Sequence, residues 1–516
     1  MKIKSQNNFF LFLISFLILG MMSCSDTSHN EKKESTSIHT AVKPITGTWI
    51  NLAYKDVRNK YTNPTVLDNT DPELWRTKVC ELHKMGIEYL VLMEVANEGR
   101  AFYPSHIMDA WYDQTKCSPV TAILDEAGKY DMKVFMSTGW AKNQDDNLLN
   151  PDIKARQLEI MEELALVYKD KSAFWGWYLP VEDCINPIFP EHAVQSVNTL
   201  VEKAHSLTPG KKTMISPYGL CLSDFDNPKY ESQLAKLKVD IIAYQDEVGC
   251  VREPLPLPKL RQNWKRLRDI HNRLNIELWA NCETFTWENG TNDRNSALIP
   301  ASYNRLLAQQ TAASNAGVDR IISFMFYGII ENPKSKYQLG QPEESHMLYE
   351  HYMSWKAGNQ YWKLVENALL GNLRNQCADI LVKGLNSSSN MLFDNELAEE
   401  NSKDSRWQHL GTGYQCIDID LKNPVPVKSL MVRTLNYNKE SIGLTGKVSL
   451  SVSDDAENYR LLSLKEIEGS SNDKHDAWIE HLLFDKLSIS TRYVRLEFQS
   501  EKEVLVDEIF VNPYIE

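Results

Sequence analysis

Two glutamates each follow a short apolar and aromatic run of the kind that forms a buried strand. Glu182 ends the run W-G-W-Y-L-P-V-E at 175–182, and Glu283 ends the run E-L-W-A-N-C-E at 277–283. Cleavage of a glycosidic bond needs one carboxyl group that protonates the leaving oxygen and a second that attacks the anomeric carbon or activates water. We therefore expect Glu182 and Glu283 to be a catalytic pair if the fold brings these two strand ends together.

Strand-like and helix-like stretches alternate from residue 45 to residue 358, which predicts an α/β domain. The expected strands are 47–52, 89–95, 133–137, 174–179, 213–217, 240–244, 277–281 and 320–326. The expected helices are 71–85, 119–130, 151–168, 191–207, 231–237, 258–274, 301–316 and 344–355. Eight strands and eight helices in this order favour a (β/α)8 TIM barrel, in which catalytic groups project from the C-terminal strand ends. An open doubly wound sheet is the competing fold, but no Gly-rich phosphate loop follows an early strand.

Aromatic and polar residues at the other expected strand ends could form platforms for sugar rings and fix hydroxyl positions. The residues expected to contact a substrate are Trp49, Glu94, Trp140, Asp183, Tyr218, Tyr244, Gln245, Asp246, Trp287 and Tyr327. Asn51 and Glu247 lie near the same rim. For any single one of these residues, packing or a rim hydrogen bond explains the pattern as well as ligand contact does.

Two alternatives for the chemistry stay open at this point. Asp183, beside Glu182, could be the working acid, and Asp246 or Glu247 could be the second carboxylate if Glu283 is not. The structural alternative is that Glu182 and Glu283 bond helix N-termini or Arg partners, because a Glu at a strand end is common in any barrel. Two glutamates after the fourth and seventh strands, each framed by aromatic residues, favour the catalytic interpretation.

The placement of one glutamate after the fourth strand and one after the seventh resembles the superfamily of retaining glycosidases called clan A. The resemblance implies that Glu182 is the acid/base, that Glu283 is the nucleophile, and that no metal or organic cofactor takes part in the chemistry. Residues 45–358 also resemble uncharacterised glycoside hydrolase-like lipoproteins of gut bacteria, in which a W-Y-x-P-x-E segment ends strand four. The implied partner is an oligo- or polysaccharide, and the implied process is glycan utilisation.

The sequence departs from the clan A pattern at Val181, where the superfamily commonly has an Asn before the acid/base. The usual hydrogen bond to the sugar 2-hydroxyl must then come from elsewhere, or the roles differ. Val181 therefore favours a second interpretation, a non-catalytic carbohydrate-binding lipoprotein on a barrel scaffold. A retaining hydrolase predicts carboxyl groups about 5–5.5 Å apart, whereas about 6.5–9.5 Å would indicate inversion.

The N-terminus has the pattern of an export signal, residues 1–24, with a basic start and an apolar run from Phe9 to Met22. The run is too short to span a bilayer comfortably. It ends in M-M-S-C, which resembles a bacterial lipobox and implies a lipidated Cys24 and an exported protein anchored to a bacterial membrane. An ordinary cleaved signal followed by a stray Cys is the alternative. Residues 25–44, rich in Ser, Thr, Lys and Glu, are expected to form a disordered tether.

After a linker at 359–377, residues 378–516 show short alternating stretches that predict an antiparallel β-sandwich. The expected strands are 415–421, 427–435, 447–452, 478–484, 493–498 and 503–511. The order of F-D-N (393–395), Trp407, I-D-I-D-L (417–421), V-S-L-S-V-S (448–453) and R-Y-V-R-L (492–496) resembles the discoidin, or coagulation factor type C, jelly-roll family. That galactose-binding-like family implies sugar binding in some members and a structural Ca²⁺ ion near the turn at Asp394.

Composition excludes two further classes of partner. The net charge is −13 and no Lys/Arg run occurs in the folded part, which argues against nucleic acid. Apart from Cys24, the cysteines are scattered without a C-x-x-C or Cys/His cluster, so a zinc site is not expected. A metal-dependent hydrolase is disfavoured, because no H-x-H follows the first strand and the 12 histidines do not cluster. Neither the sugar nor the oligomeric state follows from the sequence.

Overall fold

The structure is a computed structural model that describes residues 41–53, 60–140, 147–249, 254–290, 293, 295–374, 381–383, 391–469 and 476–513. The predicted signal segment with Cys24 and the tether up to residue 40 lie outside the described residues. Among the helices that are described, none is long and apolar enough to cross a membrane.

Eight parallel strands close into a barrel, which confirms the predicted architecture of residues 45–358. The strands are β1 (Ile45–Asn51), β2 (Tyr89–Glu94), β6 (Lys133–Ser137), β7 (Phe174–Tyr178), β8 (Lys212–Ile215), β9 (Ile241–Gln245), β10 (Glu277–Glu283) and β13 (Arg320–Phe324). They pair in the order β1-β13-β10-β9-β8-β7-β6-β2, and β2 closes the ring on β1. Because the strands are parallel, all their C-terminal ends lie on one rim.

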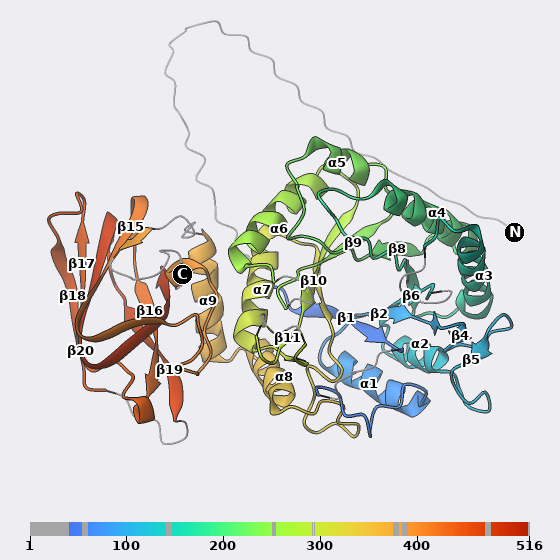
Figure 1. The fold of residues 1–516 in the computed structure, drawn as a ribbon, viewed down its shortest axis with the longest axis horizontal. Coiled ribbons are helices and arrows are strands. Elements are labelled where there is room, and N and C mark those ends of the chain that lie inside the picture. Colours follow the sequence, from blue (N-terminus) through green and yellow to red (C-terminus); the bar gives the residue numbers. More distant parts are fainter. Residues whose placement is uncertain are drawn as a thin grey trace, which may run out of the picture. The chain divides into compact units, whose positions relative to one another are not determined.

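Eight helices surround the barrel strands (Figure 1). They are α1 (Pro72–Lys84), α2 (Pro119–Lys129), α3 (Pro151–Tyr168), α4 (Glu191–Leu207), α5 (Pro228–Leu234), α6 (Leu257–His271), α7 (Tyr303–Ala316) and α8 (Glu343–Lys356). Four of them, α1, α2, α3 and α5, begin with a proline that follows a side-chain cap, at Asp71, Ser118, Asn150 and Asn227. This arrangement suits a helix start, because proline lacks only an N–H that would be unbonded there.

Aromatic side chains fill the barrel interior at the N-terminal ends of the strands. Tyr89, Phe135 and Trp175 meet Trp279 or one another edge to face, with ring centroids 5.1–5.9 Å apart. The guanidinium group of Arg320 lies 4.7 Å from the centroid of the Tyr89 ring. This aromatic layer is the floor on which the site above it rests.

Strand β7 carries an irregularity that determines which of its side chains enter the barrel. The register with β6 shifts between Val134 and Phe135, so that Phe135 lies opposite Gly176. A Cβ atom at Gly176 would lie 2.7 Å from the carbonyl oxygen of Lys212 and 2.9 Å from the Phe135 ring, so only glycine fits. Trp175 and Tyr178 consequently both contact aromatic residues of the barrel interior.

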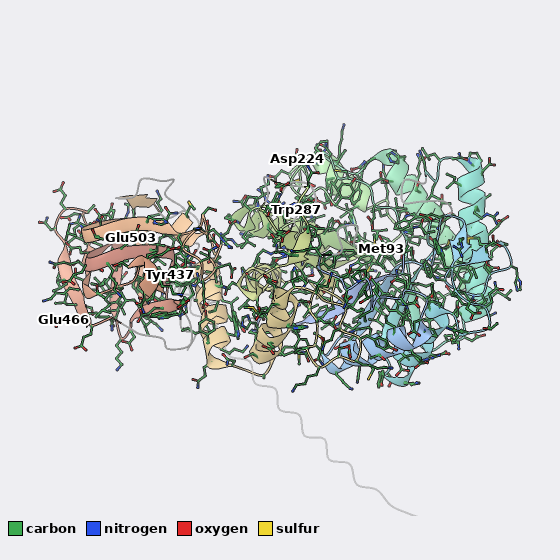
Figure 2. The ribbon with its side chains drawn as sticks, turned by 60° about the horizontal axis from the view of Figure 1, so that its bottom comes forward. Met93, Asp224, Trp287, Tyr437, Glu466 and Glu503 are labelled. Atoms are coloured by element: carbon green, nitrogen blue, oxygen red, sulfur yellow. The ribbon has the colours of Figure 1, made fainter. Side chains whose placement is uncertain are left out.

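Two small sheets were not predicted and follow barrel strands at their C-terminal ends. One contains β3 (Ala96–Asn97), β4 (Arg100–Ala101) and β5 (Asp109–Ala110), and the other pairs β11 (Phe285–Trp287) with β12 (Leu298–Pro300). Strands of two or three residues are too short to give an alternating pattern, so the sequence carries little signal for them. Met93 on β2 and Trp287 on β11 mark these two regions in Figure 2.

The C-terminal region is an antiparallel sheet of seven strands. The segment predicted as a linker contains helix α9 (Gln360–Arg374), and the strands are β14 (Leu381–Lys383), β15 (Gln408–Val427), β16 (Leu430–Tyr437), β17 (Gly446–Ser453), β18 (Arg460–Ile467), β19 (Ala477–Phe484) and β20 (Ile489–Val511). Single 3-10 turns occur at Met391–Phe393 and Asn438–Glu440. The long strand β20 pairs with β15, β16 and β17, and Figure 2 labels Tyr437 at the end of β16, Glu466 on β18 and Glu503 on β20.

Candidate active site

Acidic residues from three strands meet the C-terminal rim of the barrel. Glu94 is the last residue of β2, Glu283 is the last residue of β10, and Glu182 follows β7 by four residues. The rim is where barrel enzymes carry their reacting groups. The predicted separation of about 5–5.5 Å between the carboxyl groups of Glu182 and Glu283 stays a prediction.

The carboxylate of Glu182 is held by a tyrosine that the sequence analysis did not single out. The hydroxyl of Tyr178 donates a hydrogen bond of 2.7 Å to Oε1 of Glu182. Burial and, secondly, the charge of Glu182 raise the pKa of Tyr178 well above its ordinary value. Tyr178 therefore keeps its proton at neutral pH and acts as a hydrogen-bond donor to the carboxylate.

A chain of contacts leads from Tyr178 across the barrel to the strand that ends in Glu283. The Tyr178 ring stands edge-on to Trp49, with centroids 4.7 Å apart. Nε1 of Trp49 donates to Oδ1 of Asn281 at 3.1 Å, and Nδ2 of Asn281 donates to Oγ of Ser216 at 3.2 Å. These buried side chains form a second layer above the aromatic floor and fix the relative positions of β1, β7, β8 and β10.

Glu182 lines a cavity of about 280 Å³. Its other walls include Trp140, Val181, Asp183 and His192, which come from the segments after β6 and β7 and from the first turn of α4. Nε2 of His192 and Oδ1 of Asp183 are 3.0 Å apart, so this acid is already engaged with a neighbour. The cavity thus offers one aromatic face, one Glu and an Asp–His pair to a ligand.

Glu94 is fully buried and lies close enough to Glu182 to feel its charge. Its Oε1 accepts a hydrogen bond from the backbone N–H of Ala53, whereas its Oε2 has no hydrogen-bond partner among the described residues. Burial, and to a smaller extent the charge of Glu182, raise the pKa of Glu94 well above its ordinary value. Burial thus favours the protonated form of Glu94, which lies near a second carboxyl group and has one oxygen without a hydrogen-bond partner among the described residues.

Glu283 is nearly buried, with 6% of its surface exposed, and it packs against the loop after β9. A Cβ atom at Gly249 would overlap the carbonyl oxygen of Phe285 and would lie 3.2 Å from Oε2 of Glu283. A glycine at position 249 therefore lets the main chain approach the carboxylate directly.

Three of the residues expected to contact a substrate do not line the cavity beside Glu182. Tyr244 is fully buried, and its hydroxyl lies 2.9 Å from that of Tyr230 and 3.1 Å from Nε2 of His271. Asp246 is fully buried as well, and Tyr327 is buried with its hydroxyl donating to the carbonyl oxygen of Asn51 at 2.7 Å. The expectation that these three side chains contact a sugar is corrected, because all three are buried and bonded within the protein. Glu94 and Trp49 are as deeply buried, and the same correction applies to them.

The alternation of side chains along β9 explains why Tyr244 and Asp246 do not face the barrel interior. Successive side chains of a strand point to opposite faces, so a half-buried Gln245 places both of its neighbours on the face toward the helices. Nε2 of Gln245 donates to the carbonyl oxygen of Ser216 at 3.0 Å. Glu247, which was an alternative second carboxylate, is also buried, and its Oε2 accepts from the N–H of Cys221 at 3.3 Å.

The remaining expected residues divide by exposure. Trp49 is buried in the second layer of the barrel, and Trp140 is nearly buried at the cavity wall. Tyr218, Trp287 and Asn51 are half-buried on the segments that follow β8, on β11 and at the end of β1. Besides Tyr178, the sequence analysis missed His192 and the side chains around Asp246. His192 lies on α4, and Arg305 and Gln309, the partners of Asp246, lie on α7, so none of them is at a strand end, where site residues were expected.

No metal centre is apparent in the part of the chain that the structure describes, where no group of three or more His, Cys, Asp or Glu side chains could hold an ion. At the turn proposed to bind Ca²⁺, Oδ1 of Asp394 accepts from the N–H of Glu396 at 2.7 Å. Burial and the charge of Glu396 raise the pKa of Asp394 to about 8. The expected Ca²⁺ ion at this turn stays a prediction. The six described cysteines, Cys80, Cys117, Cys184, Cys221, Cys282 and Cys416, are free thiols.

The chain belongs to the family described as a domain of unknown function, DUF4434, whose model matches residues 45–337. No curated protein matches the sequence.

Three solved structures of glycoside hydrolase type show weak similarity. A "putative alpha-L-fucosidase" from Bacteroides thetaiotaomicron VPI-5482 is 19% identical with a TM-score of 0.47, over 64% of this chain and 99% of that one. A glycoside hydrolase family 5 protein from Bacteroides vulgatus ATCC 8482 is 10% identical with a TM-score of 0.35, over 85% and 86%. The GH5_18 protein of Streptomyces cattleya, in complex with GlcNAc, is 11% identical with a TM-score of 0.38, over 61% and 81%. TM-scores below 0.5 carry no argument about the activity of this chain.

Proposed function

We propose that the barrel is a glycoside hydrolase that cleaves an oligo- or polysaccharide with Glu182 as acid/base and Glu283 as nucleophile. The observation that carries the proposal is the carboxylate of Glu182, which lines a cavity and is bonded by a tyrosine, on the same barrel rim as Glu283. An acid/base must be reachable and must gain and lose a proton, whereas a nucleophile must stay ionised and fixed. The half-buried Glu182 and the nearly buried Glu283 suit these two tasks.

The mechanism is a retaining double displacement. The carboxylate of Glu283 attacks the anomeric carbon while Glu182 gives its proton to the leaving oxygen, and a covalent glycosyl-enzyme forms. Glu182, now ionised, then takes a proton from water, which attacks the anomeric carbon and releases Glu283. The hydrogen bond from Tyr178 supports the ionised form of Glu182 that exists between the two steps.

The test is turnover on a panel of aryl glycosides and polysaccharides, with NMR detection of the first anomer released. Glu283→Gln should remove turnover on every substrate. Glu182→Gln should lose about 10²–10⁴-fold on natural glycans and much less on dinitrophenyl glycosides, whose leaving group needs no proton. Glu288→Gln, an exposed acid paired with Lys60 just beyond β11, is the matched control and should stay active. Unchanged turnover in Glu283→Gln would exclude it from the mechanism.

A non-catalytic carbohydrate-binding protein is the second candidate, and Val181 on the cavity wall favours it. An Asn at this place would offer an amide to a sugar hydroxyl, whereas Val offers none. Glycan binding by isothermal titration without turnover on any substrate of the panel would support this function over hydrolysis.

For the N-terminus we propose that Cys24 is lipidated and that the exported chain is held at a bacterial membrane. Expression in a bacterial host with an alkyne fatty acid should label the wild-type chain and not Cys24→Ser. Labelling of both would exclude Cys24 as the acceptor, and labelling of neither would favour an ordinary cleaved signal.

For the C-terminal sheet we propose a discoidin-like, galactose-binding-like jelly roll that adds glycan affinity. The proposal includes a structural Ca²⁺ ion near Asp394. The support is the antiparallel sheet of residues 381–511 together with the sequence motifs. A higher melting temperature of the full chain in Ca²⁺ than in a chelator, reduced by Asp394→Asn, would support the ion. Equal melting temperatures would exclude it.

A further inference from the structure

The backbone N–H and the backbone carbonyl oxygen of Glu283 are both hydrogen-bonded by side chains that lie outside the barrel strands. Its N–H donates to Oδ1 of Asp246 at 3.1 Å. Its carbonyl oxygen accepts from Nη2 of Arg305 at 2.8 Å and from Nε2 of Gln309 at 3.1 Å. The last residue of a strand usually begins to lose its ladder bonds. Here three side chains take the place of the missing main-chain partners.

The same three side chains are bonded to one another. Nε2 of Gln309 donates to Oδ2 of Asp246 at 2.6 Å, and Nε of Arg305 donates to Oε1 of Gln309 at 3.2 Å. Arg305 and Gln309 are four residues apart in α7, so they lie side by side on one face of that helix. The bonds therefore tie α7, the end of β9 and the end of β10 into one buried network.

The network contains one acidic side chain, Asp246, and one basic side chain, Arg305. Burial raises the pKa of Asp246, while the hydrogen bonds from Gln309 and Glu283 and the charge of Arg305 act against that rise. Burial lowers the pKa of Arg305 to about 10, so its guanidinium group stays charged at neutral pH. Both carboxylate oxygens of Asp246 already accept bonds from protein donors. Asp246 is also fully buried, so its carboxylate serves this network and does not reach a substrate.

The hydrogen bonds fix the main chain from which the Glu283 side chain projects, and Gly249 packs against its carboxylate. A reacting group displaced by about 1 Å can cost about 10²-fold in rate. Supporting residues around a reacting group are what hold it within such limits. We propose that Asp246, Gln309 and Arg305 are positioning residues that hold the Glu283 carboxylate in line for attack. The inference rests on the proposed role of Glu283 as nucleophile.

Asp246→Asn keeps the shape of the side chain but turns an NH2 group toward the amide donor of Gln309. We expect kcat to fall at least tenfold with KM within about threefold, because the ligand contacts are unchanged and only the reacting group moves. The double variant Asp246→Asn/Gln309→Glu restores a donor–acceptor pair at this contact and should recover part of kcat. Arg305→Lys keeps the charge but loses the fork that reaches both partners, and serves as the second test if Asp246→Asn fails to fold.

Tyr244→Phe is the matched control. It removes buried hydrogen bonds from the same strand and the same face, but to Tyr230 and His271 instead of Glu283. Its kcat should stay within about threefold of the wild type. A comparable fall of kcat in both variants would mean that damage to this face of β9 in general slows turnover, and the positioning role would be overturned.

Hydrogen exchange of the Glu283 amide in the unliganded protein separates this inference from the proposed function. Exchange should be at least tenfold faster in Asp246→Asn than in the wild type or Tyr244→Phe. Faster exchange with unchanged kcat would overturn the positioning role and leave the hydrolase proposal standing. A wild-type protein with slow exchange but no turnover on any glycan would overturn the hydrolase proposal, and the positioning role would fall with it.

Discussion

Tyr178 and Glu182 are joined by a hydrogen bond of 2.7 Å that links the last residue of β7 to the carboxylate lining the cavity. The bond exists because Gly176 lets the strand shift its register, which brings Tyr178 to the barrel interior beside Trp49. A single backbone irregularity thus decides the orientation of the proposed acid/base.

Tyr178→Phe should lower turnover by about 10–100-fold, because a hydrogen bond to a charged group contributes about 1.5–3 kcal/mol. The loss should appear in kcat more than in KM, since Tyr178 is fully buried and does not reach a ligand. Steady-state kinetics on the best substrate of the panel measures it. Tyr168→Phe, which removes a buried hydroxyl bonded to Thr121 on a distant helix pair, should leave turnover unchanged.

Asp183→Asn tests whether the acid beside Glu182 could be the working acid. Asp183 is already engaged with His192, so we expect the Asn variant, which keeps a hydrogen bond there, to retain kcat within about threefold. Glu182→Gln in the same assay should lose about 10²–10⁴-fold. If the two losses are reversed, the assignment passes from Glu182 to Asp183.

Glu94→Gln should stabilise the protein at neutral and alkaline pH. The folded pKa of Glu94 is raised, so the folded state keeps a proton that the unfolded state releases above its ordinary pKa. The free energy of unfolding of the wild type then falls by about 1.4 kcal/mol per pH unit as pH rises from the unfolded toward the folded pKa. The variant lacks this term, so its advantage in urea denaturation should grow as pH rises through this range.

An exposed acid provides the comparison for that experiment. Glu457→Gln, on the surface of the C-terminal sheet, should show no such growth over the same pH range. A Glu94→Gln variant whose difference from the wild type is constant with pH would show that Glu94 is ionised in the folded protein.

Gly176→Ala should destabilise the barrel by about 1–3 kcal/mol, because the added Cβ lies within 2.9 Å of both a carbonyl oxygen and a buried ring. Gly128→Ala on α2 is the control, where the new Cβ meets only the hydroxyl of Ser172 at 3.0 Å. A helical glycine replaced by alanine gains about 1 kcal/mol, so this variant should be neutral or more stable. Urea denaturation of both variants measures the contrast.

The barrel was predictable because each of its elements carries a strong local signal. The bounds of α3 and α4 match the predicted ranges, since a capped proline start or a clear apolar period marks each of them. Helix α5 begins at Pro228 instead of 231, because the Asn227-Pro228 start was overlooked. In the C-terminal sheet, β18 was missed because it is mostly exposed, and two predicted strands proved to be the single strand β20.

The candidate site was predictable only as far as strand ends. The sequence shows that Glu182, Glu283 and the residues of 244–246 approach the rim, but not which face each side chain takes. Assigning faces requires the register of every strand, and the shift at Gly176 is invisible without the neighbouring strand. The network around Asp246 depends on side chains of α7, of which Gln309 lies 63 residues from Asp246 in the sequence, so no local pattern indicates it.

The aromatic floor beneath the site determines which end of the barrel a ligand can use. Buried rings of Tyr89, Phe135 and Trp279 fill the barrel interior at this end, and the guanidinium group of Arg320 lies over the rings of Tyr89 and Trp279. The barrel interior is therefore closed at this end, so a ligand of the proposed site can enter and leave only at the C-terminal rim.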